Sequence, residues 1–110
     1  MAQTYKVLGS IASNGTITTG QTLYQVPAST STVLSSVVIC NQGGSAAQYR
    51  VGYSTTTAFV TASYIAFGTT IAANDTHYLT FGPTLPAAGY LLFSASATTV
   101  NAIAFGCEIT

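Results

Sequence analysis

Short runs of β-branched and aromatic residues, divided by turn-forming residues about every ten positions, limit the fold of this chain more than any other feature. Val, Ile, Thr, Tyr and Phe dominate these runs, whereas the residues that fill exposed helix faces are scarce. The pattern is typical of a β-sandwich or barrel and leaves no room for a helix longer than about one turn. We expect strands at residues 4–12, 21–26, 32–41, 46–54, 62–68, 75–82, 88–96 and 99–109.

The predicted architecture is a single all-β domain over residues 1–110, an antiparallel β-sandwich of jelly-roll type with about eight short strands. A chain of 110 residues is long enough to enclose one hydrophobic core without disulfides or bound metal ions to stabilise it. Gly43 and Gly44 lie between two predicted strands. We expect them to form a hairpin turn, because glycine accepts the positive φ that such turns need.

The chain is almost free of charge. Lys6, Arg50, Asp75 and Glu108 are its only charged residues, 4% of the sequence. A free soluble domain usually has a surface that is roughly 25–35% charged. So few charges give little repulsion between molecules, and we therefore expect this surface to be covered inside a large assembly.

Composition also argues against several classes of partner. The net charge is zero, so the chain lacks the basic stripe with which proteins neutralise nucleic-acid phosphates. No apolar run is long enough to cross a bilayer, and the first residues do not read as a secretory signal. We expect no nucleic-acid or membrane partner, and synthesis in the cytoplasm.

The residues that could support chemistry are few. Cys40 and Cys107 sit in apolar runs and are predicted to be free buried thiols, although they could face one another in adjacent strands and form a disulfide. Asp75 precedes His77 by two residues, which places both on one face of a strand and allows an ion pair. Catalysis would further need a nucleophile and an oxyanion site, and a metal needs more ligands. We expect no enzymatic activity, no cofactor and no metal.

Two strands are apolar at consecutive positions, at 37–40 and at 90–93. Such runs are covered on both faces, whereas a strand of an isolated sandwich has only one face in the core. The second face therefore needs a partner or an overlying loop. We favour contact with another subunit.

The last strand offers the sharpest contrast between core and contact. One of its faces carries Ile103, Phe105, Cys107 and Ile109, and this face is predicted to be core. The other face carries Val100, Ala102, Ala104, Gly106 and Glu108, small residues that would let another subunit approach. On this interpretation Phe105→Ala unfolds the domain and Ala104→Arg leaves it folded.

The predicted interface also includes charged residues. Glu108 at the edge of the small-residue face could pair with Lys6 or Arg50 of the same or a neighbouring copy. Arg50 is expected on the outer face of its strand, because it alternates with Tyr49 and Val51. The interface prediction is therefore the set Ala102, Ala104, Glu108, Arg50 and Lys6.

Several segments, in order along the chain, resemble small structural proteins of tailed bacteriophages. Thr22 to Ala28 is similar to that family's LYxVPA segment, and Val33 to Asn41 is similar to the VVSSIVVCN strand that follows it. Residues 71–76 resemble its IPANDT turn. The closing Phe105 to Thr110 is similar to its FGSEIT ending, with Cys107 in place of serine.

The resemblance implies a non-enzymatic structural protein of a tailed-phage virion. The favoured role is a capsid decoration or cement subunit, and the alternative is a tail, neck or fibre-associated subunit that contributes to attachment to host-surface glycans. The expected partners are copies of itself, as a trimer or ring, and other virion proteins such as the major capsid protein or tail proteins. The expected location is the virion, after synthesis in the host cell cytoplasm.

Overall fold

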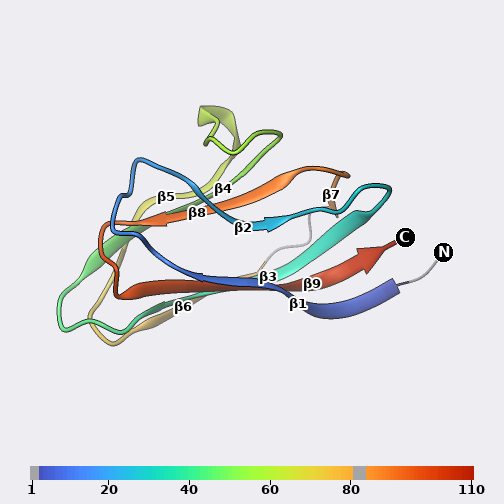
Figure 1. Ribbon diagram of the computed structural model, residues 1–110. Helices are drawn as coiled ribbons and strands as arrows, with labels where there is room; N and C mark the ends of the chain where they lie inside the picture. Colours follow the sequence, from blue (N-terminus) through green and yellow to red (C-terminus); the bar gives the residue numbers. More distant parts are fainter. Residues whose placement is uncertain (1–2, 81–83) are drawn as a thin grey trace.

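The computed structural model describes residues 3–80 and 84–110, which form two β-sheets packed face to face (Figure 1). The described residues contain no α-helix, and their one helical segment is the 3₁₀ turn η1. No helix in this part of the chain is long and apolar enough to span a bilayer. The elements are β1 (Gln3–Ala12), β2 (Gln21–Gln25), β3 (Ser31–Asn41), β4 (Ala47–Ser54), η1 (Thr61–Ser63), β5 (Tyr64–Ile71), β6 (Thr76–Thr80), β7 (Thr84–Leu85), β8 (Tyr90–Ala95) and β9 (Val100–Ile109).

The strand order is that of a jelly roll, as the sequence predicted. The larger sheet has the order β1-β9-β3-β6, with the short β7 also paired to β3, and the smaller sheet has the order β2-β8-β4-β5. All pairs are antiparallel, and they nest: β4 pairs with β5, β3 with β6, β2 with β8 and β1 with β9. A long ribbon of nested pairs has thus rolled up into a sandwich.

The strand positions follow the predicted ones closely, although residues 81 and 82 of the predicted strand 75–82 lie outside the described residues. One predicted turn was wrong. Gly43 and Gly44 follow β3, which belongs to the larger sheet, and precede β4, which belongs to the smaller one. The two strands do not pair, so this segment crosses between sheets and is not a hairpin turn. Neither glycine is among the residues with positive φ. The sequence shows that the chain turns here, but the choice between pairing and crossing depends on the other strands.

The core lies between the sheets and combines large and small side chains. Tyr49 and Phe93 are its largest fully buried members, and both come from the smaller sheet. The central strand β9 of the larger sheet contributes Val100, Ala102 and Ala104, each 0% exposed. Small side chains on one sheet thus lie across from large ones on the other, which lets the two layers interdigitate at native density.

Asn41 ties together the loops at one end of the sandwich. Its side chain is fully buried, and its amide nitrogen donates to the carbonyls of Ser45 at 2.8 Å and Ala72 at 3.2 Å. Its amide oxygen accepts from the backbone N–H of Gly43 at 2.9 Å and from the hydroxyl of Thr99 at 3.1 Å. One side chain therefore satisfies backbone groups from several connections, as a buried polar residue must.

The two cysteines lie on neighbouring strands but not side by side. Cys40 pairs with Asn101 across β3 and β9, whereas Cys107 pairs with Val33. At about 3.3 Å per residue, the seven-residue offset along β3 separates them by roughly 20 Å, far beyond disulfide reach. Both are free, as expected, and the alternative of a facing pair was wrong; Cys107 is buried as predicted, whereas Cys40 is only half-buried.

Candidate interaction surface

The solvent side of the larger sheet is a broad apolar surface. Strand register sets its composition, because residues paired across neighbouring strands point to the same side. Val38 of β3 pairs with both Ile103 of β9 and Tyr78 of β6, and Val7 of β1 pairs with Phe105 of β9. We call this surface the apolar face; its apolar members are Tyr5, Val7, Val33, Val38, Tyr78, Ile103, Phe105, Cys107 and Ile109.

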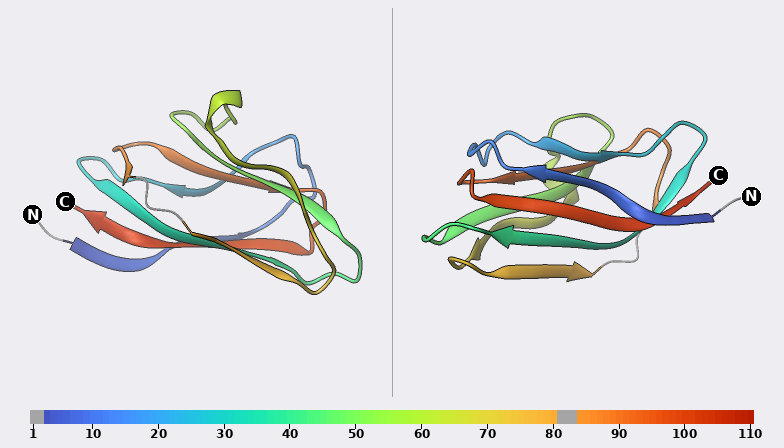
Figure 2. Two further views of the ribbon diagram at one scale, coloured as in Figure 1. Left: turned by 180° about the vertical axis from the view of Figure 1, so that it is seen from behind. Right: turned by 60° about the horizontal axis from the view of Figure 1, so that its bottom comes forward.

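The apolar face is open to solvent and carries no charge. Tyr5 is 81% exposed, Tyr78 72% and Val7 53%, and these are large hydrophobic side chains. None of the described residues that point to this side is charged, because Lys6 and Glu108 point to the other side of their strands. Figure 2 shows the strands of this sheet side by side with no described loop across them. Ser36 and Thr80 point to the same side, so the surface is apolar and uncharged polar in composition, and exposed apolar surfaces are typical of interaction sites.

The outer side of the smaller sheet is covered in a different way, by the chain's own loops. Leu92 of β8 points outward yet is fully buried. The ring of Phe59, from the loop between β4 and β5, lies over Gly52, where an added Cβ would come within 3.1 Å of it. The loop between β1 and β2 also crosses here, since the Ser94 hydroxyl donates to the Ile17 carbonyl at 2.6 Å.

The two apolar runs in the sequence thus have different explanations. For Leu91 and Leu92 the overlying loop, the less favoured alternative, is what the structure shows. For Val37 and Val38 no loop of the described chain covers the second side. Val37 is fully buried in the core, and Val38 belongs to the open apolar face.

Shallow hollows run along β9 on the apolar face. One of about 290 Å³ is lined by residues that include Tyr5, Val33 and Cys107. A second, of about 330 Å³, lies between Tyr5 and Phe105. Hollows between exposed rings give this surface the relief that side chains of a partner could enter.

The predicted faces of the last strand were reversed. Ala102 and Ala104 are fully buried in the core, whereas Ile103 and Phe105 are half-buried on the apolar face. Small residues lie inside because β9 sits in the middle of its sheet, opposite the bulky side chains of the other sheet. Ala102 and Ala104 therefore cannot contact a partner. The prediction failed because size alone does not say which side of a strand has a large neighbour.

Lys6 and Glu108 pair within the chain. Nζ of Lys6 lies 3.3 Å from Oε1 of Glu108, on neighbouring strands β1 and β9. Glu108 Oε2 also accepts a hydrogen bond from the Tyr24 hydroxyl, which comes from the other sheet and lies 2.9 Å from the Thr32 hydroxyl. The Tyr24 hydrogen bond lowers the pKa of Glu108, and Lys6 acts in the same direction. The predicted pair of Lys6 and Glu108 is thus internal to the larger sheet, and the hydrogen bond from Tyr24 links Glu108 to the smaller sheet.

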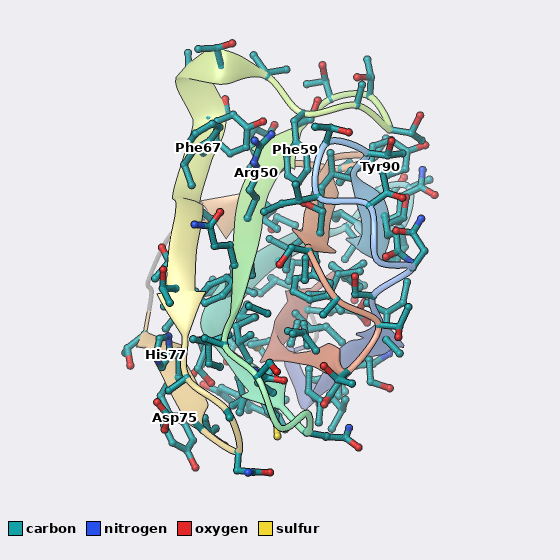
Figure 3. All side chains as sticks on the ribbon, turned by 90° about the vertical axis from the view of Figure 1, so that its left-hand side faces the viewer. Arg50, Phe59, Phe67, Asp75, His77 and Tyr90 are labelled. Atoms are coloured by element: carbon teal, nitrogen blue, oxygen red, sulfur yellow. The ribbon has the colours of Figure 1, made fainter. Side chains whose placement is uncertain are left out.

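Arg50 lies on the outer side of the smaller sheet, as its alternation predicted, and does not pair with Glu108. Its guanidinium carbon is 4.2 Å from the ring centroid of Phe67 and 6.0 Å from that of Tyr64 (Figure 3). Tyr64 in turn stacks on Phe59, with ring centroids 5.0 Å apart. An arginine over an aromatic face is a cation–π contact. The sequence separates Arg50 from Phe67 by a loop, so only the register of β4 and β5 brings them together.

His77 connects the two sheets at the edge formed by β6. Its Nδ1 lies 2.8 Å from the Tyr49 hydroxyl, and its Nε2 lies 3.6 Å from Oδ2 of Asp75. The predicted contact between Asp75 and His77 is therefore present, and Tyr49 is a partner that the sequence did not suggest. Burial raises the pKa of Tyr49, so this hydroxyl stays protonated at neutral pH. Over residues 3–80 and 84–110, no three potential metal ligands of the His, Cys, Asp or Glu type come together.

Comparison with known proteins gives a likeness of fold. No protein-family model and no curated protein matches the chain. The chain is similar to one in the structure of infectious bursal disease virus Gx strain, with a TM-score of 0.59, 9% identity and 97% of this chain covered. A chain in the structure of the Gt strain is matched with a TM-score of 0.49, 10% identity and 97% coverage.

This chain spans 32% of the length of each of those viral chains. With so few identical residues, the similarity to the Gx-strain chain shows a shared fold and nothing further.

Proposed function

We propose that this chain is a non-enzymatic structural protein of a tailed-bacteriophage virion, which packs on the capsid as a decoration or cement subunit. The observation that carries the proposal is the uncharged apolar face on the larger sheet, where Tyr5 and Tyr78 are mostly exposed. Only 4% of the residues are charged, so covering this surface with neighbouring subunits gains the free energy of apolar burial and buries little charge.

The size of the apolar face fits a subunit that is held on an assembled surface. β1, β9 and β3 have 10, 10 and 11 residues and β6 has 5, so at about 4.8 Å between strands and about 3.3 Å per residue they span roughly 570 Å². Stable complexes of two free proteins usually bury about 800 Å² on each partner. A single contact through a face of this size has low affinity. The affinity is higher on a particle, where the subunit can contact several neighbouring proteins at once. Such a subunit stabilises the assembled state because it binds that state alone.

The fold is compatible with this proposal. Jelly rolls recur in viral capsid proteins, and the chain to which this one is similar comes from the structure of a virus. The sequence motifs that resemble tailed-phage structural proteins point to the same setting. Copies of this chain and other virion proteins, such as the major capsid protein, are the partners that the apolar face suits.

A role as a tail, neck or fibre-associated subunit in glycan attachment is the second candidate. One observation favours it: a hollow of about 290 Å³ near the β5 edge is lined by residues that include Tyr53, Tyr64 and Ser63. Aromatic rings with hydroxyl groups beside them suit sugars as well as proteins. Two results would favour this role: the protein binds host-cell glycans, and phage capsids that lack the protein keep their stability.

Incorporation into particles tests the proposal. Phe105→Lys and Val38→Lys place a charge on the apolar face, and Thr70→Lys is the matched control on the exposed part of β5. We expect all three proteins to fold by circular dichroism, and only Thr70→Lys to bind phage particles that lack the wild-type chain. Electron microscopy of the complemented particles then locates the protein. Equal incorporation of the three variants would refute the use of this face.

A further inference from the structure

The β1 edge of the larger sheet is a long strand with an open side. β1 covers Gln3–Ala12, pairs with β9, and ends the strand order β1-β9-β3-β6. No described strand pairs with its other side. The opposite edge strand, β6, has only 5 residues. An edge of this length offers a row of backbone donors and acceptors to another strand.

β1 has only some of the features that protect edge strands. It contains no proline, and its one charged side chain, Lys6, is held by Glu108 on the inner side of the sheet. A register shift between Val7 and Gly9 interrupts its pairing with β9. The regular part of the edge is therefore Gln3–Val7, which is exposed throughout.

We propose that this edge pairs in antiparallel fashion with the same edge of a second copy, around a twofold axis at Tyr5. In that register Tyr5 faces Tyr5 of the other copy, Thr4 faces Lys6, and Gln3 faces Val7. An axis at Lys6 would instead place two ammonium groups opposite each other, which is unfavourable. The aromatic pair of the two Tyr5 rings is favourable. The other outward-pointing residues that face each other, Gln3 and Val7, are uncharged.

The exposure of the apolar face supports this partner. Tyr5 and Val7 are 81% and 53% exposed, whereas Phe105 and Cys107, their neighbours on β9, are more covered. The difference arises because β1 has a neighbour on one side only. A second β1 at about 4.8 Å would cover Tyr5 and Val7 and extend the apolar face across both copies.

This pairing of β1 edges is a different contact from the packing of the apolar face on a virion that is proposed above. A twofold contact closes at two copies, so a trimer or ring requires another surface. The rest of the apolar face, on β9, β3 and β6, stays free in the edge-paired dimer and can supply that surface. The dimer forms without any viral component, so its test does not depend on the proposed function.

Opposite charges at Tyr5 provide the test. Sedimentation of the full-length protein over a range of concentrations should show a monomer–dimer equilibrium for the wild type. Tyr5→Lys alone and Tyr5→Glu alone each place like charges on the twofold axis, and we expect dimerisation to weaken roughly tenfold. An equimolar mixture of the two variants should dimerise again, and added salt should weaken that mixed dimer.

Tyr78→Lys and Tyr78→Glu are the matched controls, because Tyr78 is similarly exposed on the same face but lies on β6. We expect both to dimerise like the wild type. Hydrogen exchange adds a backbone measure, since amides within Gln3–Val7 should exchange more slowly as the dimer forms.

The proposal is overturned if the wild type stays monomeric at the highest soluble concentration, or if the Tyr5 mixture fails to associate. Equal weakening by the Tyr78 variants would show packing through the face and would also overturn it. Unchanged exchange within Gln3–Val7 on dimerisation would do the same.

Discussion

The hydroxyl of Tyr24 donates a hydrogen bond to Oε2 of Glu108 and so joins the two sheets of the sandwich. Burial and the bond to Glu108 raise the pKa of Tyr24 to about 12, so the hydroxyl remains a donor at neutral pH. The same bond lowers the pKa of Glu108. The ionised carboxylate is therefore part of the folded structure, and its protonation is linked to unfolding.

Acid should destabilise the protein through Glu108. Because the pKa is lower in the folded state than its ordinary value of 4.5, the contribution of Glu108 is present above that pH. It is lost as the pH falls through the folded-state pKa. Urea unfolding at pH 7, 5 and 3 should show this loss, and Glu108→Gln should flatten the change between pH 5 and 3. An identical pH dependence in the two proteins would contradict the linkage.

Substitutions of Ala104 and Phe105 should affect folding differently. Ala104→Arg places a charge in the closed core and should prevent folding, at a cost of about 3–5 kcal/mol. Phe105→Ala removes a half-buried ring from the apolar face and should leave a folded domain. Circular dichroism and thermal unfolding compare the two. A stable Ala104→Arg protein would show that β9 is turned over relative to this structure.

The contact between Arg50 and Phe67 should contribute measurably to stability. Its geometry, 4.2 Å from guanidinium carbon to the centroid of a ring that is 61% exposed, fits a cation–π contact of about 0.5–1 kcal/mol. A double-mutant cycle with Arg50→Gln and Phe67→Leu, followed by denaturant unfolding, isolates this term. Additive effects of the two substitutions would mean that the contact contributes nothing.

A negative charge at position 41 should destabilise the fold. Asn41→Asp replaces an amide that donates to the carbonyls of Ser45 and Ala72 with a group that only accepts. Several acceptors would then face one another in a buried site, and we expect a loss of about 2–4 kcal/mol at neutral pH. Unfolding in urea measures the loss. The variant should recover part of its stability in acid, where the new carboxyl is protonated, and a pH-independent loss would argue against this account.

The sequence alone determined the fold class and nearly every strand. Val, Ile, Thr, Tyr and Phe favour extended backbone, and the turn residues between the runs mark where it stops, so both signals are local. The same alternation placed Arg50 on the outside of β4, and the spacing of Asp75 and His77 was enough to predict their contact. The scarcity of charge predicts that some surface is covered inside an assembly.

The tertiary structure alone decided which faces of the strands form the core and which are open to solvent. A strand's two faces are distinguishable in sequence, but their assignment to core or solvent depends on the strands that pack across from them. Ala102 and Ala104 lie inside, in one core cluster with the large side chains Phe93 and Tyr49 of the other sheet. Loops from distant parts of the chain cover Leu92 but not Val38. These choices rest on contacts between residues far apart in sequence, and a local pattern carries no information about them.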